Sequence, residues 1–238
     1  MGKKITYFIL AISFVVTWIW AAIEPLHFAD WVLENVLVGL FILLILFTSR
    51  MFQFSLFSYV LMTLFMILHI IGSHYTYAEV PWGFDLGAWL GTERNMYDRL
   101  VHLLFGVLFV YPVRELSVRI AKTKGFWGYF VPFMIISSFA GFYELIEWGA
   151  AIVVDPDAGV AFLGSQGDIW DAQKDMLLAI VGSFGTLLIV MLIHMIYNKK
   201  FYQEFKESFK LPKDDKPMGE VLLEEMIKRI NKEKNDHI

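Results

Sequence analysis

Long apolar stretches alternate with short polar connections along most of the chain. The apolar stretches cover about residues 5–23, 31–48, 54–73, 98–113, 126–153 and 170–197. A helix needs about 20 residues to cross ~30 Å of hydrocarbon, and these stretches are near that length. The pattern therefore predicts an all-α polytopic membrane bundle of about six transmembrane helices, with no internal repeat.

The chain becomes polar after the last stretch. Three phenylalanines recur there at i, i+4 and i+8, which favours a helix lying on the membrane surface: Phe201, Phe205 and Phe209. Residues 218–234 predict a charged amphipathic helix with one apolar side. We therefore expect a six-span transmembrane domain at residues 1–200 and a cytoplasmic amphipathic helical tail at residues 201–238.

Composition supports this interpretation. Hydrophobic residues make up 57% of the 238 residues and charged residues 18%, with a mean hydropathy of +0.56. Soluble domains are about 45–50% apolar and about 25% charged, so this chain carries too much apolar surface for water. A net charge of −4 argues against nucleic-acid binding. The sequence has no cysteine, which excludes disulfides and thiolate metal ligands.

Basic residues mark alternate ends of the predicted spans. They fall before the first span and after the second, fourth and sixth: Lys3, Lys4, Arg50, Arg114, Arg119, Lys122, Lys124, Lys199 and Lys200. The opposite connections, 24–30, 74–97 and 154–167, hold several acids and only Arg94 among lysines and arginines. The positive-inside rule therefore predicts a bacterial inner-membrane protein with both termini in the cytoplasm. The first stretch exceeds the ~7–15 apolar residues of a signal peptide, so we expect it to be retained as a span.

Acids and histidines gather in the outer halves of these spans. The members are Glu34, His69, His74, Asp98, His102, Glu144, Glu147, Asp168, Asp171 and Asp175. The spacings are i, i+4 for Asp98 and His102, i, i+3 for Glu144 and Glu147, and i, i+3, i+7 for Asp168, Asp171 and Asp175. Each set therefore shares one helix face, and three helices can direct these faces to one centre.

A divalent metal ion is the ligand that such a centre suits, because carboxylates and imidazoles on facing helices converge this way in bundle cores. The predicted metal ligands are Asp98, His102, Glu144, Asp171 and Asp175. Hard oxygen ligands with a histidine favour Zn, Mn or Fe. Glu147 or His74 is the predicted general base. Motifs for a zinc protease, a serine hydrolase or a P-loop nucleotide site are missing from the sequence, and we expect no organic cofactor.

Simpler interpretations remain open. Asp98 and Asp168 could cap helix N-termini, and the glutamates could lie at the level of the lipid headgroups. The fourth stretch argues against a purely superficial location. Only eleven residues separate His102 from Arg114, so a full span must include Asp98 and His102 or extend past Arg114. Ionisable residues inside a span are functional candidates.

Four longer motifs contain most of these residues. They are Gly72–Gly83 (GSHYTYAEVPWG), Tyr97–His102 (YDRLVH), Tyr143–Trp148 (YELIEW) and Gly167–Met176 (GDIWDAQKDM). In these motifs the sequence resembles the YjdF-like family of bacterial inner-membrane proteins, a family of unknown function. The resemblance covers roughly residues 5–197 and implies a membrane fold, with no activity attached.

A looser pattern is similar to VanZ-like membrane proteins, which are associated with glycopeptide-antibiotic resistance. Those proteins carry an aspartate four residues before a histidine, a later Glu-x-x-Gln, and a final span that opens with Asp-x-x-x-Asn. The matching positions here are Asp98 and His102, Glu144 and Glu147, and Asp171 and Asp175. Glu147 and Asp175 replace an amide in that pattern, so this chain carries more negative charge.

The leading functional hypothesis is an outward-facing metal site that acts on a lipid or envelope precursor by hydrolysis or transfer. The alternative is a proton-coupled transporter or channel that uses the same acids as a relay. Transporters commonly show inverted repeats, and this sequence shows none, which favours the first hypothesis. A third option is a scaffold whose tail recruits a partner. The expected partners are the lipid bilayer and a lipid-like substrate, and no nucleic acid.

Overall fold

A computed structural model describes residues 2–153, 165–211 and 217–236, so part of the predicted outer connection at 154–167 lies outside the described residues. The described residues form helices and no strand. Six helices are long and apolar enough to cross a membrane: α1 (Gly2–Ala21), α2 (Phe28–Met51), α3 (Leu56–His74), α5 (Tyr97–Arg119), α6 (Trp127–Val153) and α8 (Asp171–Tyr197). The prediction of an all-α bundle with six spans is confirmed.

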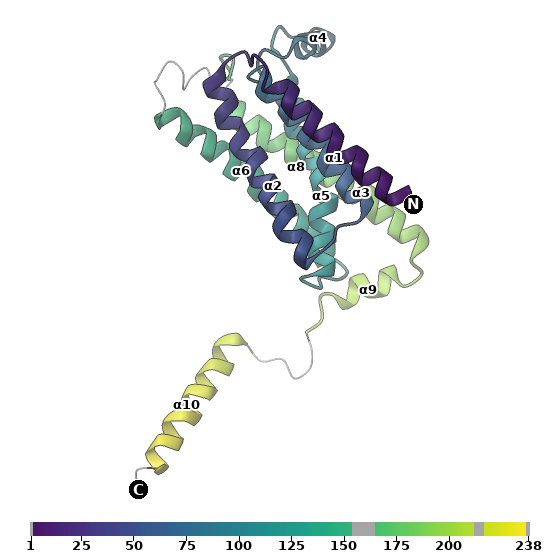
Figure 1. The fold of residues 1–238 in the computed structure, drawn as a ribbon. Helices are drawn as coiled ribbons and strands as arrows, with labels where there is room; N and C mark the ends of the chain where they lie inside the picture. The colour runs from purple at the N-terminus through teal and green to yellow at the C-terminus, as the bar shows by residue number, and fades with distance from the viewer. Residues whose placement is uncertain (1, 154–164, 212–216, 237–238) are drawn as a thin grey trace.

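Three shorter or polar helices complete the described chain: α4 (Pro81–Trp89), α9 (Phe201–Glu207) and α10 (Met218–Asp236). Figure 1 shows α4 at one end of the bundle, with the N-terminus and α9 at the other. The exposed apolar side chains of α10 include Leu222, Met226 and Ile230, as its amphipathic pattern predicts.

Helix α5 shows how the short fourth apolar stretch becomes a full span. It begins at Tyr97 and ends at Arg119, so it both includes Asp98 and His102 and extends past Arg114. Pro112 lies inside this helix and is buried. Proline lacks the N–H that would bond the preceding turn, and inside a span neighbouring helices tolerate this defect. The extra length places Asp98 and His102 in the first two turns of the helix.

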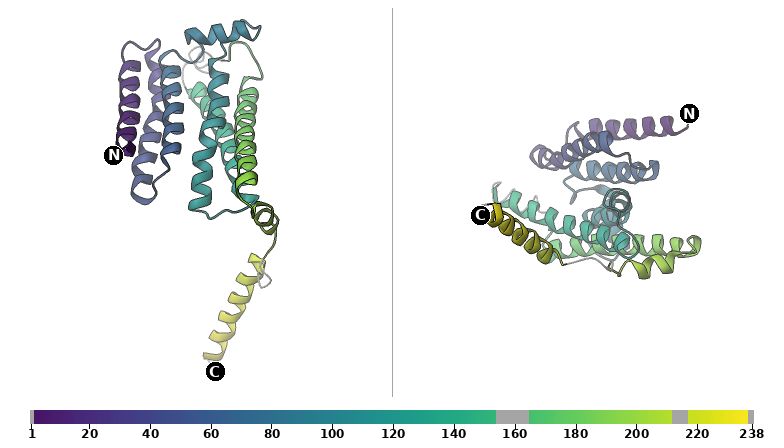
Figure 2. Two further views of the ribbon diagram at one scale, coloured as in Figure 1. Left: turned by 90° about the vertical axis from the view of Figure 1, so that its right-hand side faces the viewer. Right: turned by 90° about the horizontal axis from the view of Figure 1, so that it is seen from below.

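The bundle is organised around α5, which contacts α3, α4, α6 and α8. Figure 2 shows α1, α2 and α3 on one side of α5, with α6 and α8 on the other. The closest contact joins α5 to α8. A Cβ atom at Gly106 would lie 2.0 Å from the Ala179 carbonyl oxygen, and one at Gly182 would lie 2.3 Å from the Leu103 carbonyl oxygen. Small residues at both positions let the two backbones meet, as is usual in membrane helix pairs.

The segment before α5 is fixed by one buried asparagine. The Asn95 side chain donates to the Val80 carbonyl oxygen over 2.8 Å and accepts from the Tyr97 N–H over 3.0 Å. Gln166 pairs with the backbone of Asn95 through its own amide, at 2.9 and 3.1 Å. Gly83 of α4 has no room for a side chain, because a Cβ there would lie 1.9 Å from Asn95 Oδ1. These contacts set where α5 starts relative to α4 and to the entry into α8.

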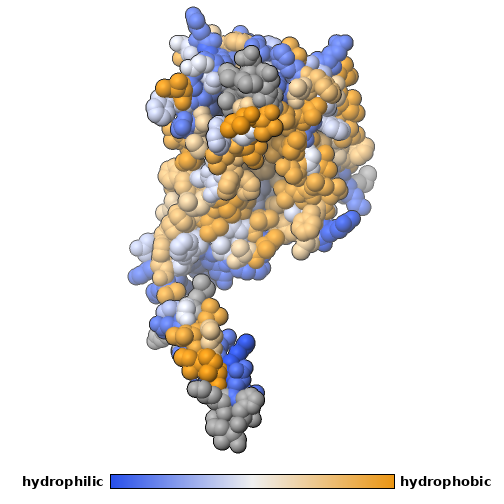
Figure 3. All heavy atoms as spheres, turned by 90° about the vertical axis from the view of Figure 1, so that its left-hand side faces the viewer, coloured by the Kyte–Doolittle hydropathy of each residue, from blue (hydrophilic) through white to orange (hydrophobic). Residues whose placement is uncertain are grey.

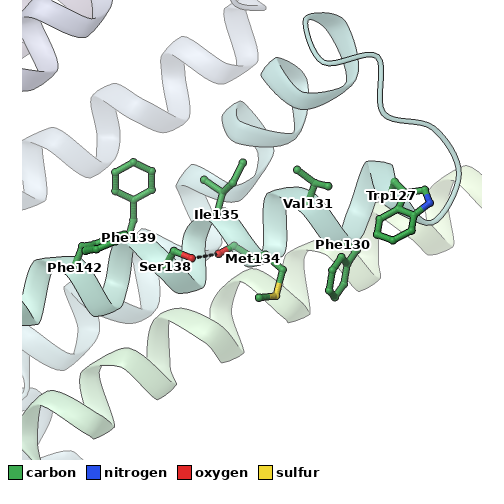
Figure 4. A pocket seen from close by; sticks show the side chains of 8 residues that line it. All are labelled: Trp127, Phe130, Val131, Met134, Ile135, Ser138, Phe139 and Phe142. Carbon is green, nitrogen blue, oxygen red and sulfur yellow. Dashed lines mark hydrogen bonds between the residues drawn. The ribbon is translucent and has the colours of Figure 1, made fainter. Parts of the chain in front are cut away.

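The outer surface of the spans is apolar. Figure 3 shows a wide hydrophobic belt between two hydrophilic ends, as expected for side chains that face lipid. A shallow groove runs along the exposed face of α6 and is shown in Figure 4; it is lined by Trp127, Phe130, Val131, Met134, Ile135, Ser138, Phe139 and Phe142. Ser138 is its polar member and donates to the Met134 carbonyl oxygen over 2.8 Å. The groove has no titratable side chain, so it offers no group for acid–base or metal chemistry.

Candidate functional site

The start of α5 and the start of α8 bring three potential metal ligands together. Asp98 and His102 are one turn apart on α5, and Asp175 lies in the second turn of α8. One ligand atom from each of the three lies within 4.8 Å of the other two. His102 and Asp175 are buried, with 8% and 2% of their surface exposed. The Gly106–Ala179 contact lies one turn further along both helices, so the close approach of α5 and α8 positions this set.

Helix α6 adds two glutamates. Glu144 Oε1 lies 3.6 Å from His102 Nε2, and Glu147 is hydrogen-bonded to Glu144. Glu147 also interacts electrostatically with Asp98 and Asp175. We define the inner cluster as Asp98, His102, Glu144 and Asp175. It joins α5, α6 and α8 at the end of the bundle that carries α4 (Figure 1).

Two carboxylate oxygens of the inner cluster are buried without a hydrogen bond. These atoms are Glu144 Oε1 and Asp175 Oδ1, neither of which has a hydrogen-bonding partner among the described residues. A buried carboxylate oxygen is normally hydrogen-bonded, because leaving it unpaired costs about 1–3 kcal/mol or more. Both atoms are therefore suited to contact a cation.

Asp171 has a different environment from the inner cluster. Its Oδ1 atom pairs with Arg94 Nη2 at 2.5 Å and with Arg99 Nη2 at 3.1 Å. Asp168 pairs with Arg99 and with Lys174, whose Nζ lies 2.6 Å from Asp168 Oδ2. We define the rim as these five residues: Arg94, Arg99, Asp168, Asp171 and Lys174. Among the described residues, the three rim cations form ion pairs with Asp168 and Asp171, and none with the inner cluster.

The rim also explains the charge state of Asp168. Hydrogen bonds from Lys174, from the Trp170 N–H and from Arg99 hold the pKa of the Asp168 carboxyl well below its usual range. Asp168 therefore acts as a paired anion at the start of α8. The Trp170 N–H donates to its Oδ1 over 3.1 Å. Trp170 is itself the N-cap of α8 and no side chain caps this helix, so the N-cap role that the sequence left open for Asp168 is not found.

His74 is occupied by contacts with α1. Its Nδ1 atom lies 3.1 Å from the Ala21 carbonyl oxygen, so this nitrogen carries the hydrogen and donates. Its ring packs on Trp20 with centroids 4.6 Å apart. These contacts hold α1 against the end of α3 and account for His74 structurally. Glu147, which contacts the inner cluster, is the better placed of the two predicted general bases.

A second polar network borders the inner cluster on the α2 side. Tyr143 donates to Glu34 Oε2 over 3.1 Å, and Glu34 interacts electrostatically with Asp98 and His102. His69 Nε2 lies 3.0 Å from the Glu34 carbonyl oxygen, and its Nδ1 lies 2.5 Å from the Tyr77 hydroxyl. Nε2 must donate to the carbonyl, so Nδ1 accepts from Tyr77.

Burial raises the pKa of the Tyr77 hydroxyl well above its usual range, and the charge of Glu34 adds to this, so Tyr77 stays a donor. Sequence reasoning placed Glu34 and His69 at this end of the molecule but missed both tyrosines. The available signal was their position within the YTYAEVPWG and YELIEW motifs, where Tyr143 directly precedes Glu144.

Six spans and a buried cluster of acids and histidine at one end define a polytopic α-helical membrane protein. The chain belongs to the family described as "Predicted membrane protein (DUF2238)", whose model matches residues 6–199. It is similar to the inner membrane protein YjdF of Escherichia coli strain K12, with 34% identity over 194 residues, covering 80% of this chain and 91% of that protein. The expected YjdF-like relationship is thereby confirmed. No solved structure matches the chain.

Proposed function

We propose that this membrane protein binds one divalent metal ion through the inner cluster. The observation that carries the proposal is the geometry of Asp98, His102 and Asp175, whose ligand atoms lie within 4.8 Å of one another. Two ligands bound tetrahedrally to one ion at about 2.0–2.2 Å each are about 3.3–3.6 Å apart. Side-chain shifts of up to about 1 Å each therefore suffice to form the site. Glu144 is near enough to provide a fourth ligand.

The charge balance also supports a cation. The inner cluster places three carboxylates beside one histidine at a buried position, where uncompensated charge is expensive. The arginines and the lysine of the rim pair with Asp168 and Asp171. A divalent ion would supply the missing positive charge and at the same time satisfy Glu144 Oε1 and Asp175 Oδ1.

The ligand types restrict the metal and its role. Three carboxylates with one imidazole suit Zn, Mn or Fe better than Cu(I). The bound ion would supply a Lewis acid that polarises a phosphoryl or carbonyl oxygen, or that activates a water. Glu147, hydrogen-bonded to Glu144, is placed to hold or accept a proton beside the ion.

The position of the cluster suggests the substrate. Most basic residues that flank the spans lie at the opposite end of the bundle from the cluster, whereas the three rim cations beside the cluster are paired with acids. By the positive-inside rule this excess directs the cluster outward and both termini to the cytoplasm. A site within the first turns of spanning helices lies near the level of lipid headgroups. We therefore propose a metal-dependent hydrolase or transferase that acts on a lipid or envelope precursor at the outer leaflet.

Metal content is the direct test. Protein purified without chelators should carry about one Zn, Mn or Fe per chain, measured by elemental mass spectrometry. Asp175→Asn and His102→Ala should reduce the bound metal at least tenfold, whereas Asp171→Asn should reduce it less, because Asp171 is held by the rim. Asp85→Asn is the matched control, since Asp85 is an exposed acid of α4 at the same end. A wild-type protein that neither carries these metals nor binds them on titration would refute the proposal.

A proton-coupled transporter is the second candidate, and the Glu34 network favours it. Glu34, Tyr143, His69 and Tyr77 extend the polar groups from the inner cluster toward α2 and α3 through hydrogen bonds. Chains of titratable side chains can relay protons. Here His69 meets the Glu34 backbone carbonyl, so a relay would need water to join His69 to the Glu34 carboxylate. Proton uptake into proteoliposomes by metal-free protein, abolished by Glu34→Gln, would favour transport over the metal site.

A further inference from the structure

A second polar site lies at the opposite end of the bundle, between α5, α6 and α8. Its centre is Arg114, whose guanidinium carbon lies 4.7 Å from the centroid of the Tyr129 ring. Arg114 Nη2 lies 3.4 Å from His194 Nδ1, and the Tyr129 hydroxyl lies 2.7 Å from the same nitrogen. Because two donors point at Nδ1, this nitrogen carries no hydrogen and His194 is neutral. The two side chains that contact the Arg114 guanidinium, Tyr129 and His194, are therefore uncharged.

The positive charge of Arg114 lacks a carboxylate. Among the described residues it forms no ion pair, and its Nε atom is buried with no hydrogen-bond acceptor. Arg119, five residues later on the same helix, shows the contrast, because it pairs with Glu115. Glu204 of α9 acts electrostatically on His194, but it is an exposed residue that already accepts a hydrogen bond from Asn198 over 3.0 Å. A guanidinium near the end of a span that has no carboxylate partner is available to an anion at the membrane surface.

Helix α9, which follows two lysines and carries more, is held close to the start of α6. The Trp127 Nε1–H donates to the Ser208 carbonyl oxygen over 2.9 Å, and Phe126 packs on Phe209 with ring centroids 5.0 Å apart. Gly125 has a φ of +52°, and a Cβ there would lie 2.6 Å from the Glu204 carbonyl oxygen, so only glycine fits. The connection into α9 carries two exposed lysines, Lys199 and Lys200, and α9 with its end carries Lys206 and Lys210.

We propose that Arg114, together with Lys199 and Lys200, binds the phosphate group of an anionic phospholipid in the leaflet at the α9 end. A guanidinium binds phosphate through two parallel hydrogen bonds, and Arg114, which is half-buried and forms no ion pair among the described residues, can take such a ligand. Basic pockets between spanning helices are a general means of holding anionic headgroups. The aromatic side chains that dock α9 lie at the same level, where amphipathic rings anchor proteins at membrane interfaces. This site is separate from the inner cluster and does not depend on the proposed metal.

Lipid titration of the purified full-length chain tests the site. Phosphatidylglycerol added to the detergent-solubilised protein should raise its Tm more than phosphatidylcholine does, and native mass spectrometry should show the retained anionic lipid. Arg114→Gln should weaken phosphatidylglycerol binding at least fivefold. Arg50→Gln is the matched control, because Arg50 is an exposed arginine in the last turn of α2 at the same end. It should weaken phosphatidylglycerol binding less than Arg114→Gln does.

Two results would overturn the proposal. Equal binding by Arg114→Gln and Arg50→Gln would show that Arg114 is not the anion-binding residue. Stabilisation by inorganic phosphate alone that matches the effect of phosphatidylglycerol would show that the ligand is a free anion. Should Arg114→Gln fail to fold, Lys199→Gln with Lys200→Gln decides the matter, because both side chains are exposed. Removing each lysine should weaken binding about fivefold, and an unchanged affinity would also refute the site.

Discussion

Replacing Gly106 with alanine is expected to damage both the α5–α8 contact and metal binding. The added Cβ would lie 2.0 Å from the Ala179 carbonyl oxygen and 2.8 Å from the Ser183 nitrogen. Both are backbone atoms of α8, so neither can rotate away as a side-chain tip can. Ordinary contacts of this kind begin at 3.4 Å, so the helices must separate locally by about 1.4 Å.

The size of the effect follows from that separation. Overfilling a well-packed contact costs about 1–3 kcal/mol. For a chain of this length, such a loss corresponds to a fall in Tm of roughly 2–12 °C. The displacement occurs one turn from His102 and Asp175, and metal–ligand distances tolerate only about ±0.2 Å. We therefore expect metal affinity to fall by roughly 10–100-fold, the range seen when groups that position ligands are lost.

Gly185→Ala is the matched control for this prediction. Gly185 lies on α8 less than one turn beyond Gly182, and a Cβ there meets nothing within 4 Å. Both variants gain the helix propensity of alanine, about 1 kcal/mol, so the difference between them isolates the steric effect. Thermal unfolding and metal titration of both proteins in the same detergent provide the measurement. Equal Tm values and equal metal affinities would show that the α5–α8 approach does not position the ligands.

Two further predictions concern the ends of the helices. Glu115→Ala should lower the free energy of unfolding by about 1.5–3 kcal/mol, because the Glu115 carboxylate accepts the Ser55 N–H at the start of α3 over 2.8 Å. Thermal unfolding measures this loss, and an unchanged Tm would show that water replaces the carboxylate. Asp168→Asn should lower the Tm at pH 7, because the pKa of Asp168 is lowered by Lys174 and Arg99 in the folded chain. This contribution is present above the pKa of the unfolded carboxyl, about 3.9, and is lost as the pH falls through the folded value, so the gap to wild type should shrink below about pH 4. A gap that stays constant with pH would contradict the assignment.

Local pattern was sufficient for most of the fold. Apolar stretches predicted six spans, and the described residues include six helices able to cross a membrane. Counting residues between His102 and Arg114 also showed that α5 had to be longer than its apolar stretch, and it extends at both ends. These features depend on properties of single segments, namely length and hydrophobicity, which are readable without knowing any neighbour.

Asp171 and Asp175 show what the local sequence pattern could not predict. Both lie on one face of α8 and were predicted as metal ligands together. One helical turn, about 6 Å, separates them along the axis, and this turn decides whether an aspartate meets the arginines of the rim or His102. The depth of α8 relative to α5 sets that outcome, and the Gly106 and Gly182 contacts fix the depth.

The sequence by itself thus determined the class of protein, the number of spans and the gathering of acids and histidines at one end, because each follows from hydropathy and helical periodicity. Only the tertiary structure decided which acids converge, that Tyr143 reaches Glu34, and that Arg114 at the other end is left without a carboxylate. The physical reason is that helix rotation and depth arise from backbone contacts between residues far apart in the chain, and no local pattern records them.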